Sequence, residues 1–264
     1  MPKRADVFLV EHGHAATRAE AQAAIRAGNV RANGVVVLKP SQPIADGAAV
    51  EYVRAHPYVS RGALKLAAAL DHFALSPAGL VCIDIGASAG GFTELLLERG
   101  ARMVYAVDVG HGQLHPKLAA DPRVAALEGV NARYLTRAHV PDPAEAIVAD
   151  VSFISLERVL PPAMGFAAAG AWLVALVKPQ FEAGRGHVDK GGIVKDEAVQ
   201  RTALQSVAGW LAAQPGWVVV GTMESPIAGG DGNREFLVAA KRNSPLREGR
   251  NPRRRFRGGV MSRP

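Results

Sequence analysis

From residue 60 onward, short apolar runs alternate with helical patterns, and this alternation limits the possible folds more than any other feature of the chain. The expected strands are LVCIDI, MVYAVDV, VAALEG, AIVADV, AWLVALV, WVVVGTM and EFLVAA. Segments such as FTELLLERG and DEAVQRTALQSVAGWLAAQ lie between them and have the periodicity of helices. The pattern predicts an α/β domain with a doubly wound, mostly parallel, seven-stranded sheet, whose ligands bind beyond the carboxyl ends of the strands.

Composition places the chain among globular proteins of a reducing compartment. Its 264 residues are 48% hydrophobic and 21% charged, which provides enough apolar material for a packed core. The single cysteine, Cys82, excludes an intramolecular disulfide and predicts a cytoplasmic location. Residues 159–177 carry no charge, but the Pro161-Pro162 pair and two glycines interrupt them. We therefore expect a helix, a turn and a strand there, and no membrane segment.

The first 52 residues have the pattern of a separate small domain. TRAEAQAAIRAGNV predicts a helix that begins with a capping box formed by Thr17 and Glu20. VRANGVVV follows, and its Asn33-Gly34 pair predicts a tight hairpin turn between two short strands. The expected organisation is an α+β module over residues 1–52, a linker over 53–59, the α/β domain over 60–241 and a tail over 242–264.

Most of the basic charge lies at the carboxyl end. The formal net charge is +7, and the segment from Lys241 to the end holds nine Lys or Arg and one Glu. This segment is rich in Arg, Pro and Gly, so we expect the tail to be disordered when free and to attract polyanions such as RNA. A merely solubilising tail is the alternative interpretation.

The amino-terminal module resembles the RNA-binding domain named after ribosomal protein S4. The matching parts are Arg4, the TRAEAQ helix start, the AGNVRANG turn and the following Lys39-Pro40. The resemblance implies an RNA partner, for which basic side chains would supply phosphate contacts. The candidate RNA-binding residues are Lys3, Arg4, Arg18, Arg26 and Arg31 in the module and Arg61 after the linker. For any one of them, a solvated helix face is the alternative.

The turn GASAGGF after the first expected strand predicts a nucleoside ligand. Its glycines let the backbone approach a ligand closely. Asp108 ends the next strand, 22 residues after Gly86, where it can accept hydrogen bonds from ribose hydroxyls. The turn lacks the G-x-G-x-x-G spacing of dinucleotide sites and the GK[ST] of a P-loop. S-adenosylmethionine remains as the common nucleoside ligand of such a turn, with Asp84 placed to orient its amino-acid end. A helix cap or a loop acid is the alternative for either aspartate alone.

Polar residues appear where the buried strands end. Asp150 follows AIVA, Lys178 follows AWLVALV, Glu235 begins the last strand, and Lys65 lies on the helix before the sheet. The ends of parallel strands share one edge, and an antiparallel last strand would bring Glu235 to it. Lysines normally titrate near ~10.4, but a neighbouring cation and partial burial can lower a lysine pKa enough for base catalysis. Two lysines and two acids in one cleft therefore suit deprotonation of a poorly acidic hydroxyl, although each alone could be a surface ion-pair partner.

This set resembles the Lys-Asp-Lys-Glu tetrad of FtsJ-like ribose 2′-O-methyltransferases, and the whole chain resembles the TlyA family of ribosomal RNA 2′-O-methyltransferases, sometimes labelled hemolysins. The segments that carry the resemblance are YVSRGALKLAAAL, IDIGASAGGFTELLL, VYAVDVGHGQL, VNARYL, ADVSFISL, LVKPQFEAGR and GNREFL. The family often has SRGGEKL where this chain has SRGALKL.

The resemblance implies a Rossmann-like fold that uses S-adenosyl-L-methionine to methylate a cytidine 2′-hydroxyl in small- or large-subunit ribosomal RNA. The implied catalytic residues are Lys65, Asp150, Lys178 and Glu235. The implied cofactor-binding residues are Asp84, Gly86, Ala87, Ser88, Gly90, Gly91, Phe92, Asp108 and Asn131. No metal site is expected. The alternatives are a non-catalytic RNA-binding assembly factor and a cytolysin. A cytolysin would need a secretion signal or a membrane-active segment, and neither is evident in the sequence.

Overall fold

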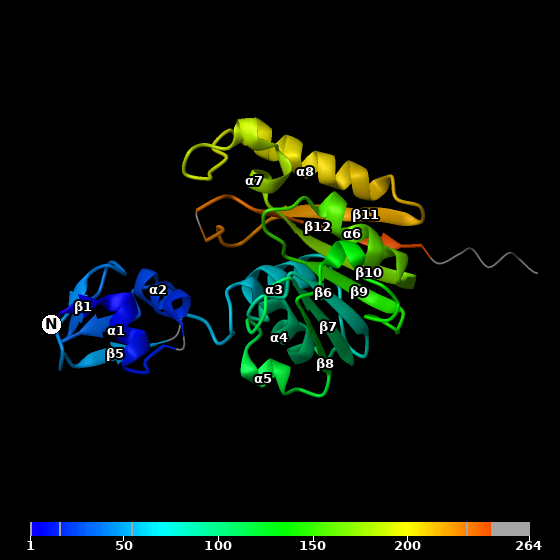
Figure 1. The fold of residues 1–264 in the computed structure, drawn as a ribbon. Helices are drawn as coiled ribbons and strands as arrows, with labels where there is room; N and C mark the ends of the chain where they lie inside the picture. Colours follow the sequence, from blue (N-terminus) through cyan, green and yellow to red (C-terminus); the bar gives the residue numbers. More distant parts are fainter. Residues whose placement is uncertain (1, 16, 54, 231, 244–264) are drawn as a thin grey trace, which may run out of the picture.

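The computed structural model describes residues 2–15, 17–53, 55–230 and 232–243. Within them, a small amino-terminal module is followed along the chain by a larger α/β domain (Figure 1). The tail predicted over residues 242–264 falls outside the described residues, apart from its first two positions.

The module packs two helices against two small sheets. Its helices are α1 (Ala5–Glu11) and α2 (Arg18–Arg26). Its strands are β1 (Lys3–Arg4), β2 (Val30–Ala32), β3 (Val35–Val36), β4 (Pro43–Ile44) and β5 (Val50–Tyr52). Strand β1 pairs with β4, and β2 lies between β3 and β5. The core between the helices and sheets contains Phe8, Leu9, Ile25, Val30 and Ile44.

Local signals in the module act as predicted. The Thr17 side chain accepts a hydrogen bond from the Glu20 N–H at 3.2 Å and so caps α2. Asn33 and Gly34 both have positive φ, at 49° and 76°, which is the backbone of the tight turn expected between β2 and β3. These contacts fix the helix–hairpin unit from short-range sequence alone.

The larger domain contains the predicted seven-stranded, mostly parallel sheet. Its strands are β6 (Val81–Ile85), β7 (Met103–Asp108), β8 (Val124–Glu128), β9 (Ala144–Ala149), β10 (Ala167–Val177), β11 (Trp217–Glu224) and β12 (Phe236–Arg242). The order across the sheet is β11-β12-β10-β9-β6-β7-β8. All neighbours from β10 to β8 are parallel, whereas β12 is antiparallel to both β10 and β11.

Helices cover both faces of this sheet, because alternate residues of its strands point to opposite sides. The helical elements are α3 (Gly62–His72), α4 (Gly91–Glu98), α5 (Pro116–Ala119), η1 (Ala132–Tyr134), α6 (Leu156–Gly165), α7 (Pro179–Glu182), η2 (Arg185–His187) and α8 (Glu197–Ala212). Helices α3, α4 and α5 pack with Cys82 and Val148 on one face. Helices α6 and α8 pack with Ile83 and Ile147 on the other.

Helix α6 is the helix of the expected helix, turn and strand. It continues through Pro161 and Pro162 and ends at Gly165, and β10 follows from Ala167. An interior proline usually costs a helix ~3 kcal/mol. Five buried residues of α6 offset this cost: Leu156, Val159, Leu160, Ala163 and Met164. In the described residues, the structure contains no helix of the length and apolarity that a bilayer crossing requires.

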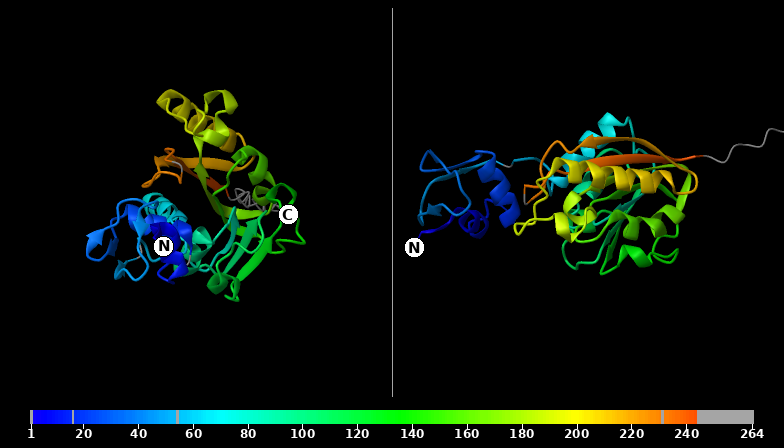
Figure 2. Two further views of the ribbon diagram at one scale, coloured as in Figure 1. Left: turned by 60° about the vertical axis from the view of Figure 1, so that its left-hand side comes forward. Right: turned by 90° about the horizontal axis from the view of Figure 1, so that it is seen from above.

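The sheet topology gathers the predicted site residues at one edge. Strands β6, β7, β9 and β10 end there, and the pairing of Val177 with Phe236 brings the start of β12 beside the end of β10. The amino-terminal module lies on the same side of the molecule as the loops after β10 and before β12 (Figure 2). We call this edge the rim, defined by residues 86–92, Asp108, Asp150, Lys178 and Glu235.

Candidate active site

The structure joins the four predicted catalytic residues into two ion pairs. Lys65 Nζ, from α3, lies 2.5 Å from Glu235 Oε2, which immediately precedes β12. Lys178 Nζ, just after β10, lies 2.6 Å from Asp150 Oδ1, just after β9. Two cations and two anions from four separate elements therefore meet at the rim.

The Lys65–Glu235 pair is the buried one. The two side chains are 9% and 3% exposed. Gly229 packs against the Glu235 carboxylate so closely that an added Cβ would lie 2.5 Å from Oε1. A charge so enclosed is stable mainly because its partner is present, so this pair holds a fixed geometry.

The Lys178–Asp150 pair is the accessible one. The side chains are 12% and 22% exposed. The contact is an ion pair by distance, but its angle falls outside the range of a hydrogen bond. Lys178 Nζ instead donates a hydrogen bond to Ser152 Oγ at 3.0 Å. Lys178 is thus the lysine that a substrate hydroxyl can reach.

The glycine-rich turn lies directly beside this pair. Gly86 has φ 82°, and a Cβ there would collide with the Asp150 carbonyl oxygen. Gly90, with φ 96°, is the N-cap of α4, and a Cβ there would collide with Leu118. Both positions therefore require glycine, and the backbone of the turn stays open to a ligand.

Asp108 connects this turn to the next strand. Its Oδ2 accepts a hydrogen bond from the Ser88 N–H and its Oδ1 from the Gly110 N–H, both at 2.8 Å. Each carboxylate oxygen has a second lone pair, so the group can still accept hydrogen bonds from a diol. Its contact with a ribose stays a prediction.

Asp84 lies beneath the turn with an unusual environment. It is fully buried, its Oδ2 accepts a hydrogen bond from Thr93 Oγ1 at 2.6 Å, and its Oδ1 has no hydrogen-bond partner in the described part of the chain. Burial raises the pKa of Asp84 to about 7. A buried acceptor without a donor, next to a turn that excludes side chains, fits a site that a polar ligand completes.

Two of the predicted cofactor-binding residues have structural roles. The Phe92 side chain is 3% exposed and packs toward Gly62 on α3, so only its backbone can face a ligand. Asn131 Oδ1 accepts a hydrogen bond from the Arg133 N–H at 3.1 Å and caps η1. Ala87 is also buried, while Ser88 and Gly91 belong to the turn and the start of α4.

Comparisons with known proteins agree with this geometry. The family model described as FtsJ-like methyltransferase matches residues 58–242, and the S4 domain model matches residues 3–50. A Mycobacterium tuberculosis (strain ATCC 25618 / H37Rv) protein, the 16S/23S rRNA (cytidine-2′-O)-methyltransferase TlyA, is 46% identical over 237 residues, which cover 89% of this chain and 88% of that protein. This chain belongs to the TlyA family of FtsJ-like methyltransferases.

Two further relatives carry the hemolysin label of this family. Hemolysin A of Brachyspira hyodysenteriae is 40% identical over 89% of this chain and 98% of that protein. The solved structure named "Putative hemolysin from Streptococcus thermophilus" is 42% identical, with a TM-score of 0.73, and covers 92% of this chain and 90% of that one. The resemblance to the TlyA family and the methyltransferase fold predicted from the sequence are therefore confirmed.

The predicted RNA-binding residues of this TlyA-family chain lie on the module surface, except Arg61 at the N-cap of α3. Lys3 pairs with Glu11 at 2.6 Å, and Arg26 and Arg31 contact Gln22 Oε1 and the Gly34 carbonyl. Arg4 and Arg18 both contact Asp6. Their role in RNA binding stays a prediction.

Phe153 is a candidate that sequence reasoning missed. It is 90% exposed and has φ 67°, a strained conformation for a bulky residue. Its ring lies 5.0 Å from that of Phe181, three residues beyond Lys178. The exposed Phe153 ring, beside the half-buried Phe181 and near Lys178, offers a stacking surface for a base. The signal was a phenylalanine in a loop between strand and helix, where no periodicity calls for an apolar side chain.

Glu182 is a second missed residue. Its Oε1 accepts a hydrogen bond from the Leu156 N–H at 2.9 Å and thereby satisfies a donor at the start of α6. Burial raises the pKa of Glu182 to about 7, with a further contribution from Glu157. Glu182 thus connects the segment after Lys178 to the end of the loop that begins with Asp150.

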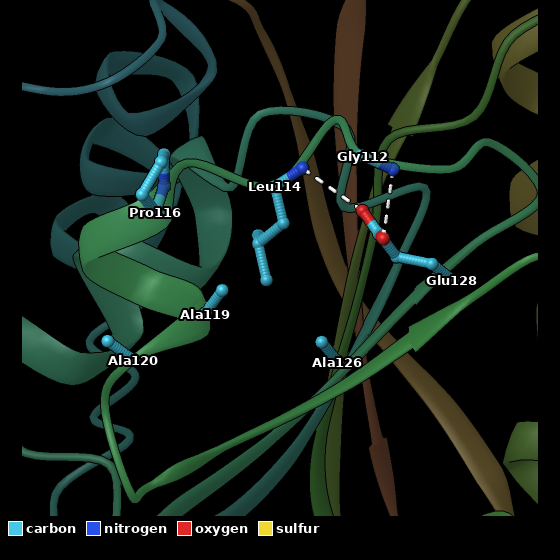
Figure 3. A pocket seen from close by; sticks show the side chains of 7 residues that line it. All are labelled: Gly112, Leu114, Pro116, Ala119, Ala120, Ala126 and Glu128. Atoms are coloured by element: carbon cyan, nitrogen blue, oxygen red, sulfur yellow. Dashed lines mark hydrogen bonds between the residues drawn. The ribbon is translucent and has the colours of Figure 1, made fainter.

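A cavity of about 540 Å³ lies elsewhere, between α5 and β8 (Figure 3). Its walls are mostly apolar, and the Glu128 carboxylate at one side accepts hydrogen bonds from the backbone N–H groups of Gly112, Gln113 and Leu114. None of the predicted catalytic or cofactor residues lines it. The four predicted catalytic residues therefore lie at the rim and not in this cavity.

Proposed function

We propose that this chain transfers a methyl group from S-adenosyl-L-methionine to the ribose 2′-hydroxyl of cytidine in ribosomal RNA of the small or large subunit. The observation that carries the proposal is the pair of lysine–carboxylate contacts beside a glycine-rich turn. The family relative from Mycobacterium tuberculosis, named for the same reaction on 16S and 23S rRNA, supports it.

The cofactor would be held by the turn of residues 86–92 and by Asp108 and Asp84. Bound there, S-adenosylmethionine supplies an electrophilic methyl group. The backbone of the open turn would lie against the cofactor, and Asp108 would accept hydrogen bonds from the cofactor's ribose. The unpartnered Asp84 oxygen would orient the amino-acid end, directly or through water. Asn131 would border the base while it caps η1.

The chain's own residues would activate the hydroxyl. Lys178 in its neutral form would accept the proton as the oxygen attacks the methyl carbon, and Asp150 would stabilise the resulting ammonium. The carbon–sulfur bond would break as the new carbon–oxygen bond forms, and S-adenosylhomocysteine would be the leaving group. Lys65, fixed by Glu235, would hold the ribose. Holding the reacting atoms in line would supply much of the acceleration.

The amino-terminal module would bring the RNA to this site. We propose that residues 1–52 act as an RNA-binding unit, connected through residues 53–59 to a catalytic unit of residues 60–241, and that the chain works with ribosomal subunits in the cytoplasm. Arg61 and the Phe153–Phe181 pair would contact the nucleotide at the rim. The basic tail of residues 242–264 would add non-specific affinity.

The test is methyl transfer from labelled S-adenosylmethionine to separated bacterial small and large subunits, with the modified nucleotide mapped. The wild-type chain should label a cytidine 2′-oxygen. Lys178→Ala should abolish labelling and leave the dissociation constant of the cofactor unchanged. Lys241→Ala, an exposed lysine at the other end of β12, is the matched control and should retain activity. Full activity of Lys178→Ala would show that another group takes the proton.

The same assay distinguishes this enzyme from the alternative, a non-catalytic RNA-binding assembly factor. A non-catalytic assembly factor would bind subunits without labelling them in any condition. The two intact lysine–carboxylate pairs favour the enzyme, because a binding protein gains nothing from a buried pair beside a ligand turn.

A further inference from the structure

Asp6 occupies a central position in the amino-terminal module that the proposed chemistry does not use. Its side chain is fully buried in the first turn of α1. Four donors converge on it: Arg4 Nε at 3.0 Å and Arg4 NH2 at 3.2 Å, Arg18 NH2 at 2.9 Å, and Gln22 Nε2 at 2.8 Å. The arginines hold the pKa of Asp6 far below its usual range, so the carboxylate stays charged.

The two arginines remain accessible although they share this partner. The Arg4 and Arg18 side chains are 50% and 58% exposed. Each guanidinium has five N–H donors, and Asp6 engages only some of them. Arg4 ends β1 and Arg18 begins α2, so one buried carboxylate fixes two forks from separate elements in one orientation.

Such an arrangement lowers the entropic cost of ligand binding. A free surface arginine carries ~2 kcal/mol of side-chain entropy, part of which a ligand must remove. Arginines that a buried anion already orders lose less side-chain entropy when they bind a ligand. A phosphodiester matches the planar fork, because guanidinium groups bind its oxygens in bidentate geometry.

We propose that Asp6 assembles Arg4 and Arg18 into a two-armed clamp for a backbone phosphate of structured RNA. The proposal rests on the proposed function, since it identifies the part of the module that grips the RNA. It makes Asp6 a positioning residue: an anion that strengthens the binding of an anionic ligand.

The substitution Asp6→Asn separates this idea from simple electrostatics. It removes a negative charge, so a module that binds RNA through net charge alone would bind more tightly. A clamp that has lost its organiser should bind more weakly, by roughly 5- to 20-fold in dissociation constant. Glu51→Gln removes an exposed negative charge from β5 and is the matched control. It should leave binding unchanged or slightly tighter.

Arg18→Lys and Arg4→Lys provide a second test, which leaves the buried carboxylate in place. Each keeps the charge and the possibility of an ion pair with Asp6 but loses the planar fork. Each should weaken binding roughly 3- to 10-fold without changing its salt slope, since the slope follows the number of charges. Arg201→Lys, at an exposed position on α8 outside the module, is the control and should bind as the wild type does.

The measurement is the affinity of the full chain for purified bacterial small and large ribosomal subunits across a salt series, with circular dichroism to verify folding. If Asp6→Asn unfolds the module, the two lysine variants decide the question alone. Unchanged or tighter binding by folded Asp6→Asn, or wild-type affinity of both lysine variants, would overturn the clamp. Failure of the proposed function looks different: the wild-type chain would then neither bind nor methylate either subunit.

Discussion

Replacing Lys65 with methionine should lower the free energy of unfolding by about 3–4 kcal/mol at pH 7 but only about 1 kcal/mol at pH 5. Methionine keeps most of the apolar stem of lysine, so the change mainly removes the charge. It leaves the Glu235 carboxylate, 3% exposed, without the cation that lies 2.5 Å away in the wild type. The effect should therefore depend strongly on pH.

The magnitude follows from the cost of leaving the Glu235 carboxylate unpaired or protonating it. A buried ion pair is roughly neutral in stability relative to an apolar pair, so the main cost is that of the unpaired charge. The carboxyl group can avoid that cost by taking up a proton, and a glutamate with an ordinary pKa of about 4.3 does so at about 1.4 kcal/mol per pH unit above that value. Protonation therefore sets the upper limit, and stability should fall as the pH rises.

Urea unfolding followed by tryptophan fluorescence at pH 5, 6, 7 and 8 measures this directly. The double variant Lys65→Met with Glu235→Gln is the control, because it replaces the carboxylate with a neutral group of the same shape. It should recover most of the lost stability at pH 7 yet remain inactive. A pH-independent loss, or a double variant as unstable as the single one, would refute the reasoning.

Three further predictions concern the rim and its neighbours. Asp108→Ala should weaken S-adenosylmethionine binding by about 1–3 kcal/mol, which is the scale of a lost charge-assisted hydrogen bond. An unchanged dissociation constant in calorimetry would show that another residue contacts the ribose. Burial raises the pKa of Glu182 to about 7 from 4.5, so its ionised form costs stability as the pH rises through that window. Glu182→Gln should accordingly stabilise the chain more at pH 8 than at pH 5 in urea unfolding, and an equal gain at both would contradict this. Phe153→Gly should raise stability by about 1 kcal/mol by relieving positive φ, while slowing methyl transfer to subunits; a loss of stability would argue against strain.

The sequence was sufficient for the strands and for the edge where the site residues gather. Strand endings predicted that Asp150 and Lys178 would be neighbours, because parallel strands share an edge. The sequence could not predict that Lys65 pairs with Glu235, since that depends on side-chain directions in elements 170 residues apart. It also missed the Phe153 conformation, because backbone strain leaves no periodic signal.

The contacts of Asp6 have a similar cause. The arginines of the module were predicted as candidate phosphate contacts, and the structure in addition ties Arg4 and Arg18 to Asp6. Sequence patterns do not predict contacts between side chains from separate elements.

The position of β12 has a consequence for how this protein matures. The last strand in the described residues inserts between β10 and β11, and its first residue follows Glu235 directly. A growing chain therefore carries Lys65 without its partner until nearly the whole domain has been synthesised. Sheet closure and assembly of the Lys65–Glu235 pair become one late event, so a chain truncated before Glu235 should lack the complete set of four charged residues at the rim. Competence to modify RNA would then report that the entire domain has folded.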